Sequence, residues 1–181
     1  MNTKFSSEET MSSIVVRLAA AAVALTLAHV AIADDLSHKD KKYMTKTAQG
    51  LISEVAMGEM AQKNAADERV KQFGKRMVDD HGKELADLKQ LASQKKVSLP
   101  DAMDHGQKKE FDKLSKLSGK DFDQEYVKYE AKDHKEDVED QGKEMKSTSD
   151  PDLKKFASAS YDTVSKHKQN IDELHRALGG K

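Results

Sequence analysis

The chain has 181 residues, of which 35% are charged, two are proline and none is cysteine. The absence of cysteine excludes a disulfide scaffold, a thiolate zinc site and a cysteine nucleophile. Its 31 basic and 32 acidic side chains nearly cancel, so no overall field favours nucleic acid, and we predict no nucleic-acid partner. The low mean hydropathy of −0.81 excludes a protein with several membrane spans. Abundant Lys, Glu, Asp and Ala favour long helices.

Residues 1–33 have the three-part pattern of a secretory signal peptide. An uncharged, mostly apolar stretch over residues 18–33 follows Arg17 and ends in the small-x-small pattern Ala31-Ile32-Ala33. This stretch is shorter than the roughly 20 residues of a membrane span. We therefore predict cleavage after it and no transmembrane span in the mature chain, with an uncleaved N-terminal anchor as the alternative. A start at Met11 would leave Arg17 as the only charge before the stretch, so we predict Met11 as the start.

Export places the mature chain, residues 34–181, in an envelope compartment. We predict the periplasm of a Gram-negative bacterium, with association with the outer membrane as the alternative. A chain without thiols cannot be trapped there in wrong disulfides, which agrees with this compartment. The remaining length suffices for one compact core, so the mature chain is predicted to be a single domain.

The mature chain carries four helical patterns. Apolar residues recur at steps of three and four in four stretches, over residues 40–64, 67–95, 121–146 and 151–178. This spacing is typical of amphipathic helices that bury one face. The link between the second and third stretches is about 23 residues long, is broken by Pro100 and is predicted to contain a short helix over residues 104–117.

We therefore predict an all-α fold, a ferritin-like four-helix bundle with a long, partly helical crossover. The crossover is long enough to travel the length of the bundle, which would make the second and third helices parallel. An up-down-up-down bundle with a decorated loop is the alternative. Glycines at positions 58, 74, 82 and 142 lie inside helical stretches. Each costs about 1 kcal/mol of helix stability, and we expect close helix approach or space for ligands to compensate.

Three histidines occupy positions on the apolar stripes where Leu or Ile would be expected. His81, His134 and His167 each fall near the middle of a predicted helix, so helices laid side by side would bring the imidazoles to a similar depth. Glu54 lies beside the apolar stripe of the first helix, also near its middle. The set is three histidines and one carboxylate, one from each helix. These ligands suit a divalent transition metal such as Zn, Fe, Ni or Cu.

Hydrogen-bond partners for such histidines are also present. Asp80 and Asp133 directly precede two of them, Glu130 lies one turn before the histidine of the third helix, and Tyr126 lies one turn earlier. A metal-bound histidine generally donates its second N–H to such a group. The same residues, with Gln141, would also form a metal-free polar layer that fixes the register of the helices. Both interpretations stay open.

Several sequence elements resemble the bacterial family catalogued as domain of unknown function 4142, whose members are labelled exported or outer-membrane proteins. The elements are MVDDH at residues 77–81, SG-x-x-FD-x-x-Y at residues 118–126, and the histidines of the third and fourth helices. The resemblance covers residues 40–178. It implies a ferritin-like helical bundle and no established activity.

Ferritin-like di-iron proteins carry Glu-x-x-His on two helices. Here the residue three positions before each of the three histidines is Val78, Ala131 or Val164. The di-iron set is therefore absent, and neither ferroxidase activity nor iron storage is expected of this chain.

Two classes of function remain. The first is a non-enzymatic envelope protein, linked to stress tolerance, that binds a metal through the His/Glu layer, an envelope protein partner, or a second copy of itself in a homodimer. The second is a mononuclear metal-dependent or redox enzyme that uses the same residues. We prefer the first, because the sequence shows no general base and no substrate pocket. No catalytic residue is assigned.

Overall fold

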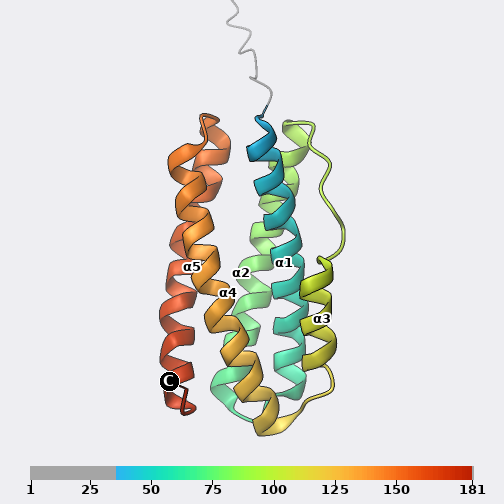
Figure 1. Cartoon of the computed structure of the whole chain (residues 1–181), viewed down its shortest axis with the longest axis vertical. Helices are drawn as coiled ribbons and strands as arrows, with labels where there is room; N and C mark the ends of the chain where they lie inside the picture. Colours follow the sequence, from blue (N-terminus) through green and yellow to red (C-terminus); the bar gives the residue numbers. More distant parts are fainter. Residues whose placement is uncertain (1–35, 181) are drawn as a thin grey trace, which may run out of the picture. The chain divides into compact units, whose positions relative to one another are not determined.

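The computed structural model describes residues 36–180, so the predicted signal peptide and the Met11 start lie outside the described residues. Within residues 36–180 every regular element is an α-helix (Figure 1). The helices are α1 (His38–Asn64), α2 (Glu68–Gln94), α3 (His105–Leu114), α4 (Gly119–Ser147) and α5 (Pro151–Ala177). The all-α prediction is confirmed, and α3 is the short helix expected in the crossover.

Local sequence explains where the long helices begin. At the start of α1, Ser37 and Asp40 form a capping box, in which each side chain accepts a hydrogen bond from the backbone N–H of the other. Asp67 caps α2 by accepting from the backbone N–H of the second residue of the helix. Asp150 caps α5, and Pro151 follows in the first turn, where its missing N–H costs nothing.

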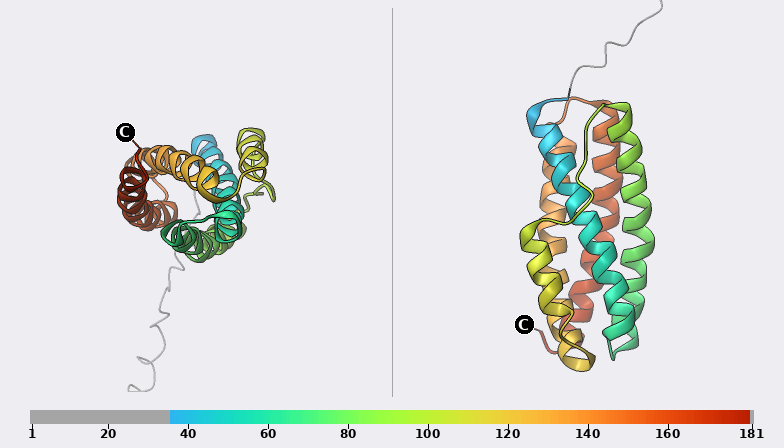
Figure 2. Two further views of the ribbon diagram at one scale, coloured as in Figure 1. Left: turned by 90° about the horizontal axis from the view of Figure 1, so that it is seen from below. Right: turned by 90° about the vertical axis from the view of Figure 1, so that its right-hand side faces the viewer.

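The four long helices form an up-down-down-up bundle, as the length of the crossover predicted (Figure 1). The α1–α2 and α4–α5 links are tight turns, whereas the chain between α2 and α4 returns along the bundle through α3. Seen end-on, α3 lies outside the ring of four helices, beside α1 (Figure 2). The Asn64 side-chain amide donates to the carbonyl of Leu117, which joins the end of α1 to the start of α4. Helices α2 and α4 are consequently parallel.

Buried apolar side chains form two separate clusters. The first cluster consists of Met57, Met60, Ala61, Ala65, Val70, Phe73, Met77, Leu114, Phe122, Tyr126, Val127, Ile171 and Leu174. The second consists of Leu36, Met44, Ala48, Leu51, Leu88, Leu91, Ala92 and Leu153. In α1, α2 and α5 the residues of the two clusters are separated along the helix by a buried polar residue: Glu54, His81 or His167. A polar layer thus interrupts the core at mid-height.

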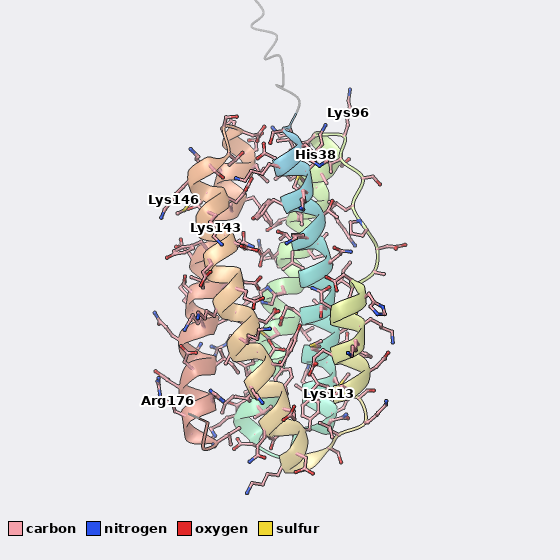
Figure 3. The ribbon with its side chains drawn as sticks, viewed as in Figure 1. His38, Lys96, Lys113, Lys143, Lys146 and Arg176 are labelled. Carbon is pink, nitrogen blue, oxygen red and sulfur yellow. The ribbon has the colours of Figure 1, made fainter. Side chains whose placement is uncertain are left out.

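Charged side chains cover the outside of the bundle, and the six basic residues labelled in Figure 3 are all exposed. Many ion pairs join neighbours on one helix, such as Lys83 with Asp87. Exposed pairs of this kind contribute little to stability. No helix within residues 36–180 is long and apolar enough to cross a membrane.

Two glycines bring α1 and α2 into close contact. A Cβ atom on Gly58 would lie 2.6 Å from the backbone oxygen of Gly74, and a Cβ on Gly74 would lie 2.7 Å from the Cβ of Ala61. Both distances are shorter than real Cβ contacts, so only glycine permits this approach. At Gly82 an added Cβ would meet no atom of the described residues within 4 Å. The expected compensation by close packing therefore holds at Gly58 and Gly74 but not at Gly82.

We expect Gly74→Ala to lower the free energy of unfolding by about 1–3 kcal/mol, because the added methyl group overpacks the α1–α2 contact. Gly82→Ala is a matched control on the same helix. It should raise that free energy by about 0.5–1 kcal/mol, because alanine favours helix and has room there. Urea unfolding followed by circular dichroism measures both. Equal effects of the two substitutions would contradict the close approach.

Candidate metal centre

The three core-facing histidines meet in the interior of the bundle. His81 on α2 and His134 on α4 have no exposed surface, and His167 on α5 is 2% exposed. Their ring centroids are 5.0 Å apart for His81 and His167, 5.5 Å for His134 and His167, and 5.9 Å for His81 and His134. One ring nitrogen of each lies within 4.8 Å of a ring nitrogen of both others. We call this set the histidine cluster.

Two rings of the cluster are held by acceptors on their own helices. His81 Nδ1 lies 3.1 Å from a carboxylate oxygen of Glu84, three residues later. His134 Nδ1 lies 3.1 Å from the backbone oxygen of Glu130, four residues earlier. Carboxylates and carbonyls only accept hydrogen bonds, so Nδ1 carries the proton on both rings. This assignment leaves a lone pair on the Nε2 atom of each.

The third ring is held from another helix. His167 Nε2 lies 2.8 Å from a carboxylate oxygen of Asp80 on α2, so the His167 proton belongs on Nε2 and its lone pair on Nδ1. Within residues 36–180 the other nitrogen of each ring is buried and has no hydrogen-bond partner: His81 Nε2, His134 Nε2 and His167 Nδ1. All three histidines therefore have one nitrogen bound to an acceptor and one free. Metal-ligating histidines show this pattern.

An aromatic ring packs against the cluster. The ring centroid of Phe73 lies 5.8 Å from that of His134 and 6.4 Å from that of His167, both in edge-to-face geometry. Phe73 belongs to the first apolar cluster. It therefore shields these two imidazoles from solvent and lowers the local dielectric, which strengthens electrostatic interactions in the cluster.

Glu54, predicted as the fourth ligand, lies to one side of the histidine cluster. Glu54 instead forms a group with Glu130 and His134. One ligand atom from each of these three residues lies within 4.8 Å of the other two. Among the described residues, the group formed by the three histidines does not include it. Glu130, predicted as a hydrogen-bond partner, thus lies beside Glu54 as a second buried carboxylate. We call Glu54 and Glu130 the carboxylate pair.

The other predicted partners take different positions. Asp80 contacts His167 across the α2–α5 interface rather than the histidine that follows it, because consecutive helical residues point about 100° apart. Asp133 accepts a long hydrogen bond of 3.4 Å from Tyr129, and no hydrogen bond within residues 36–180 joins it to a histidine. Tyr126 is fully buried, and its hydroxyl has no hydrogen-bond partner in the described part of the chain.

Sequence reasoning missed Glu84 and Asp137. Each follows a cluster histidine by three residues, a spacing that places it on the same helix face. That spacing was the available signal, but many exposed carboxylates in this sequence share it. Burial raises the pKa of Asp137, and the nearby Asp133 carboxylate acts in the same direction.

Burial also shifts the pKa values of the polar layer. It raises the pKa of Glu54 well above its ordinary range, with the Glu130 and Asp133 carboxylates adding to the effect. It lowers the pKa of His167, and His81 lowers it further. His167 is therefore neutral at pH 7, as metal ligation requires. For His134, burial lowers the pKa, but Glu130 and other carboxylates outweigh it and the net shift is upward.

Two cavities reach the polar layer from different sides. The larger, of about 770 Å³, is lined by residues of α1, α3 and α4 and extends to His81 and Glu54. The smaller, of about 590 Å³, lies between α2 and α5 and extends to His167 and Asp80. The histidine cluster is thus buried yet adjoins space that an ion or a small molecule can enter.

Comparison with known proteins identifies the family. The chain belongs to the family described as Domain of unknown function (DUF4142), whose profile matches residues 25–174, and the predicted resemblance is confirmed. Two solved structures similar to the bundle are "CopM in the Cu(I)-bound form", with a TM-score of 0.66, and "CopM in the Ag-bound form (by co-crystallization)", with a TM-score of 0.65. Each is 19% identical and covers 78% of this chain and 98% of the other. This likeness shows the helical-bundle fold. No curated protein matches the chain.

We expect Glu54→Gln to stabilise the metal-free protein at neutral pH. The pKa of Glu54 is higher in the folded than in the unfolded chain, so the wild type loses stability as the pH rises through that interval. Glutamine cannot ionise, so the free energy of unfolding of the variant should exceed that of the wild type at pH 8, and the difference should vanish as the pH falls to 4. Urea unfolding in EDTA at several pH values measures this. The exposed Glu59→Gln on the same helix is the control, and an equal gain there would refute the assignment.

Proposed function

We propose that this member of the DUF4142 family is an exported, periplasmic protein that binds a divalent transition-metal ion at the histidine cluster and serves in stress tolerance. One observation carries the proposal. Three imidazoles from three different helices, His81, His134 and His167, each have one nitrogen at an acceptor and one buried nitrogen without a protein partner within residues 36–180. A single metal ion bound by these three free nitrogens would give each of them a partner.

The energetic cost of the partnerless nitrogens favours a bound ligand. A buried polar atom without a hydrogen bond costs about 1–3 kcal/mol. Three such atoms would cost about 3–9 kcal/mol, which is comparable with the whole stability of a typical domain. A metal-free layer could satisfy them if one ring turned an N–H toward a neighbour. The acceptors instead hold the N–H groups of all three rings away, on Glu84, Glu130 and Asp80.

Ligand chemistry narrows the choice of metal. Neutral imidazole nitrogen suits Zn, Cu, Ni and Fe, and no thiolate is available in this chain. A tetrahedral centre with bonds of about 2.0–2.1 Å needs nitrogens roughly 3.4 Å apart. In the structure, one ring nitrogen of each histidine lies within 4.8 Å of a ring nitrogen of both others. Small side-chain adjustments would bring these nitrogens to the required separation. CopM, whose bundle is similar, has been solved in Cu(I)-bound and Ag-bound forms, which supports a metal-handling role for this type of bundle.

A second candidate function is a mononuclear metal-dependent enzyme. The observation that favours it is the cavity of about 770 Å³ that reaches His81 and Glu54, since such a space would admit a substrate. The same space would equally admit an ion to a binding protein. If the metal-loaded protein turns over neither peroxide nor hydrolysable esters, the binding role is the one that remains. If it turns over either substrate, and His81→Ala abolishes that turnover, the enzyme is favoured.

The export part of the proposal rests on residues 1–33 alone. We expect the protein recovered from the periplasm of an expressing bacterium to begin at Asp34, because the small-x-small pattern that ends at Ala33 is a cleavage signal. N-terminal sequencing and mass measurement of the fractionated protein test this. A chain that retains residues 18–33 in the membrane fraction would support the uncleaved anchor instead.

We expect untagged protein to bind one transition-metal ion per chain at the histidine cluster, and His81→Ala or His167→Ala to abolish that binding. Elemental analysis and titration with Zn²⁺, Cu²⁺, Ni²⁺ and Fe²⁺ measure this. At a free-ion concentration of 100 times the Kd, ion binding should stabilise the fold by about 2.7 kcal/mol, which is measured as a higher melting temperature. The exposed His105→Ala is the control. No metal-dependent shift between pH 5 and 8 would sink the proposal.

A further inference from the structure

The carboxylate pair is the strongest feature that the histidine cluster leaves unexplained. Glu54 is 1% exposed and Glu130 is fully buried. Among the described residues, neither carboxylate pairs with a lysine or arginine, and all four of their oxygens lack a hydrogen-bond partner. An ionised carboxylate buried without a partner costs several kcal/mol. Lysine and arginine side chains of residues 36–180 supply no positive charge to the pair, and His134 beside Glu130 can offer only one positive charge for the two carboxylates.

The geometry brings a third ligand atom to the pair. Glu130 and His134 lie four residues apart on one face of α4, and His134 Nδ1 is 3.4 Å from a carboxylate oxygen of Glu130. Glu54 approaches from α1, and ligand atoms of all three residues lie within 4.8 Å of one another. The other ring nitrogen, His134 Nε2, is the free nitrogen of the histidine cluster. His134 therefore lies between the carboxylate pair and the other two histidines.

A further oxygen adjoins the same place. Tyr126 lies one turn before Glu130 on α4, and its buried hydroxyl has no partner among the described residues. Burial raises the pKa of Tyr126, and the charges of Glu130 and Glu54 raise it further. Tyr126 therefore keeps its proton, and its position one turn before Glu130 places it on the same buried face of α4 as that carboxylate. It offers a neutral oxygen to the same space.

We propose that Glu54, Glu130 and His134 form a second cation site, so that the bundle holds two divalent ions that share the His134 ring. The second ion would bind one oxygen from each carboxylate and His134 Nδ1, whose proton passes to solvent as the ion binds. Two carboxylates and one imidazole suit a harder ion than three imidazoles do, with Mn²⁺ as the representative. Through its shared ring the proposal rests on the proposed function. It differs from a di-iron site in that an imidazole, not a carboxylate, is shared.

Charge balance supports two ions rather than one. An ion at the histidine cluster meets three neutral rings, so its two positive charges are offset only by the acceptors behind them, such as Asp80 and Glu84. Those carboxylates lie on α2, whereas the carboxylate pair lies on α1 and α4. The two negative charges of Glu54 and Glu130 then match a separate divalent ion. A single proton, whether on His134 or shared between the two carboxylates, would neutralise only one of them.

The experiment loads the untagged full-length mature protein with one equivalent of Zn²⁺, which fills the histidine cluster, and then titrates Mn²⁺. Binding of Mn²⁺ is followed by the loss of the free-ion signal in electron paramagnetic resonance. We expect the wild type and the exposed control Glu59→Gln to bind one Mn²⁺ per chain. Glu54→Gln and Glu130→Gln should keep the Zn²⁺ and lose the Mn²⁺. Circular dichroism establishes that each variant is folded.

The possible outcomes separate the two proposals. If Zn²⁺ binds and Mn²⁺ stays free in the wild type, the second site is overturned and the histidine site stands. If Mn²⁺ binding survives in both Glu54→Gln and Glu130→Gln, the assignment of the ligands is overturned. If Mn²⁺ binds in the wild type but Zn²⁺ binding is unaffected by His81→Ala, the histidine site fails and the carboxylate site stands alone. If neither ion binds, both proposals fail.

Discussion

The structure depends on one constraint, which is that polar groups buried in the middle of a thin helical bundle need partners. The polar layer interrupts the core between two apolar clusters. Those clusters supply the hydrophobic stabilisation, and the layer determines which register of the helices is acceptable. A shift of one helix by a turn would move an imidazole about 5 Å along the bundle, away from its acceptor and into apolar packing. The glycine contact between Gly58 and Gly74 limits such sliding for α1 against α2.

The layer also lies across the seam between two tightly packed helix pairs. Helix α1 packs mainly on α2, and α4 packs mainly on α5, with far less contact between the pairs. The histidine cluster joins α2 to α4 and α5, and the carboxylate pair joins α1 to α4. Both cavities reach the layer, and the larger one lies on the α1–α4 side of the seam. The polar groups are therefore buried enough to shift their pKa values and still accessible enough to exchange a ligand.

Helix α4 differs from its neighbours because it serves both halves of the layer. Tyr126, Glu130 and His134 follow one another at intervals of four residues and form a polar line on its buried face. Further along, Gln141 and Glu144 are also buried, so the second half of this helix contributes little apolar surface. A helix kept only for packing would carry leucine at such positions. The concentration of polar groups on α4 agrees with the ligand binding proposed above.

The sequence by itself determined the helical class and the four buried stripes, and it favoured the parallel arrangement of α2 and α4 over an up-down-up-down bundle, which only the tertiary structure excluded. Helical periodicity shows which face of each helix is buried, and a link that spans the bundle permits only certain topologies. It also placed His81, His134 and His167 in the core, because each replaces an aliphatic residue in a regular stripe. Only the tertiary structure decided which side chains meet. Asp80 pairs with His167, and Glu54 lies with Glu130, because these contacts depend on the rotation and separation of neighbouring helices, which the repeat along one helix does not encode.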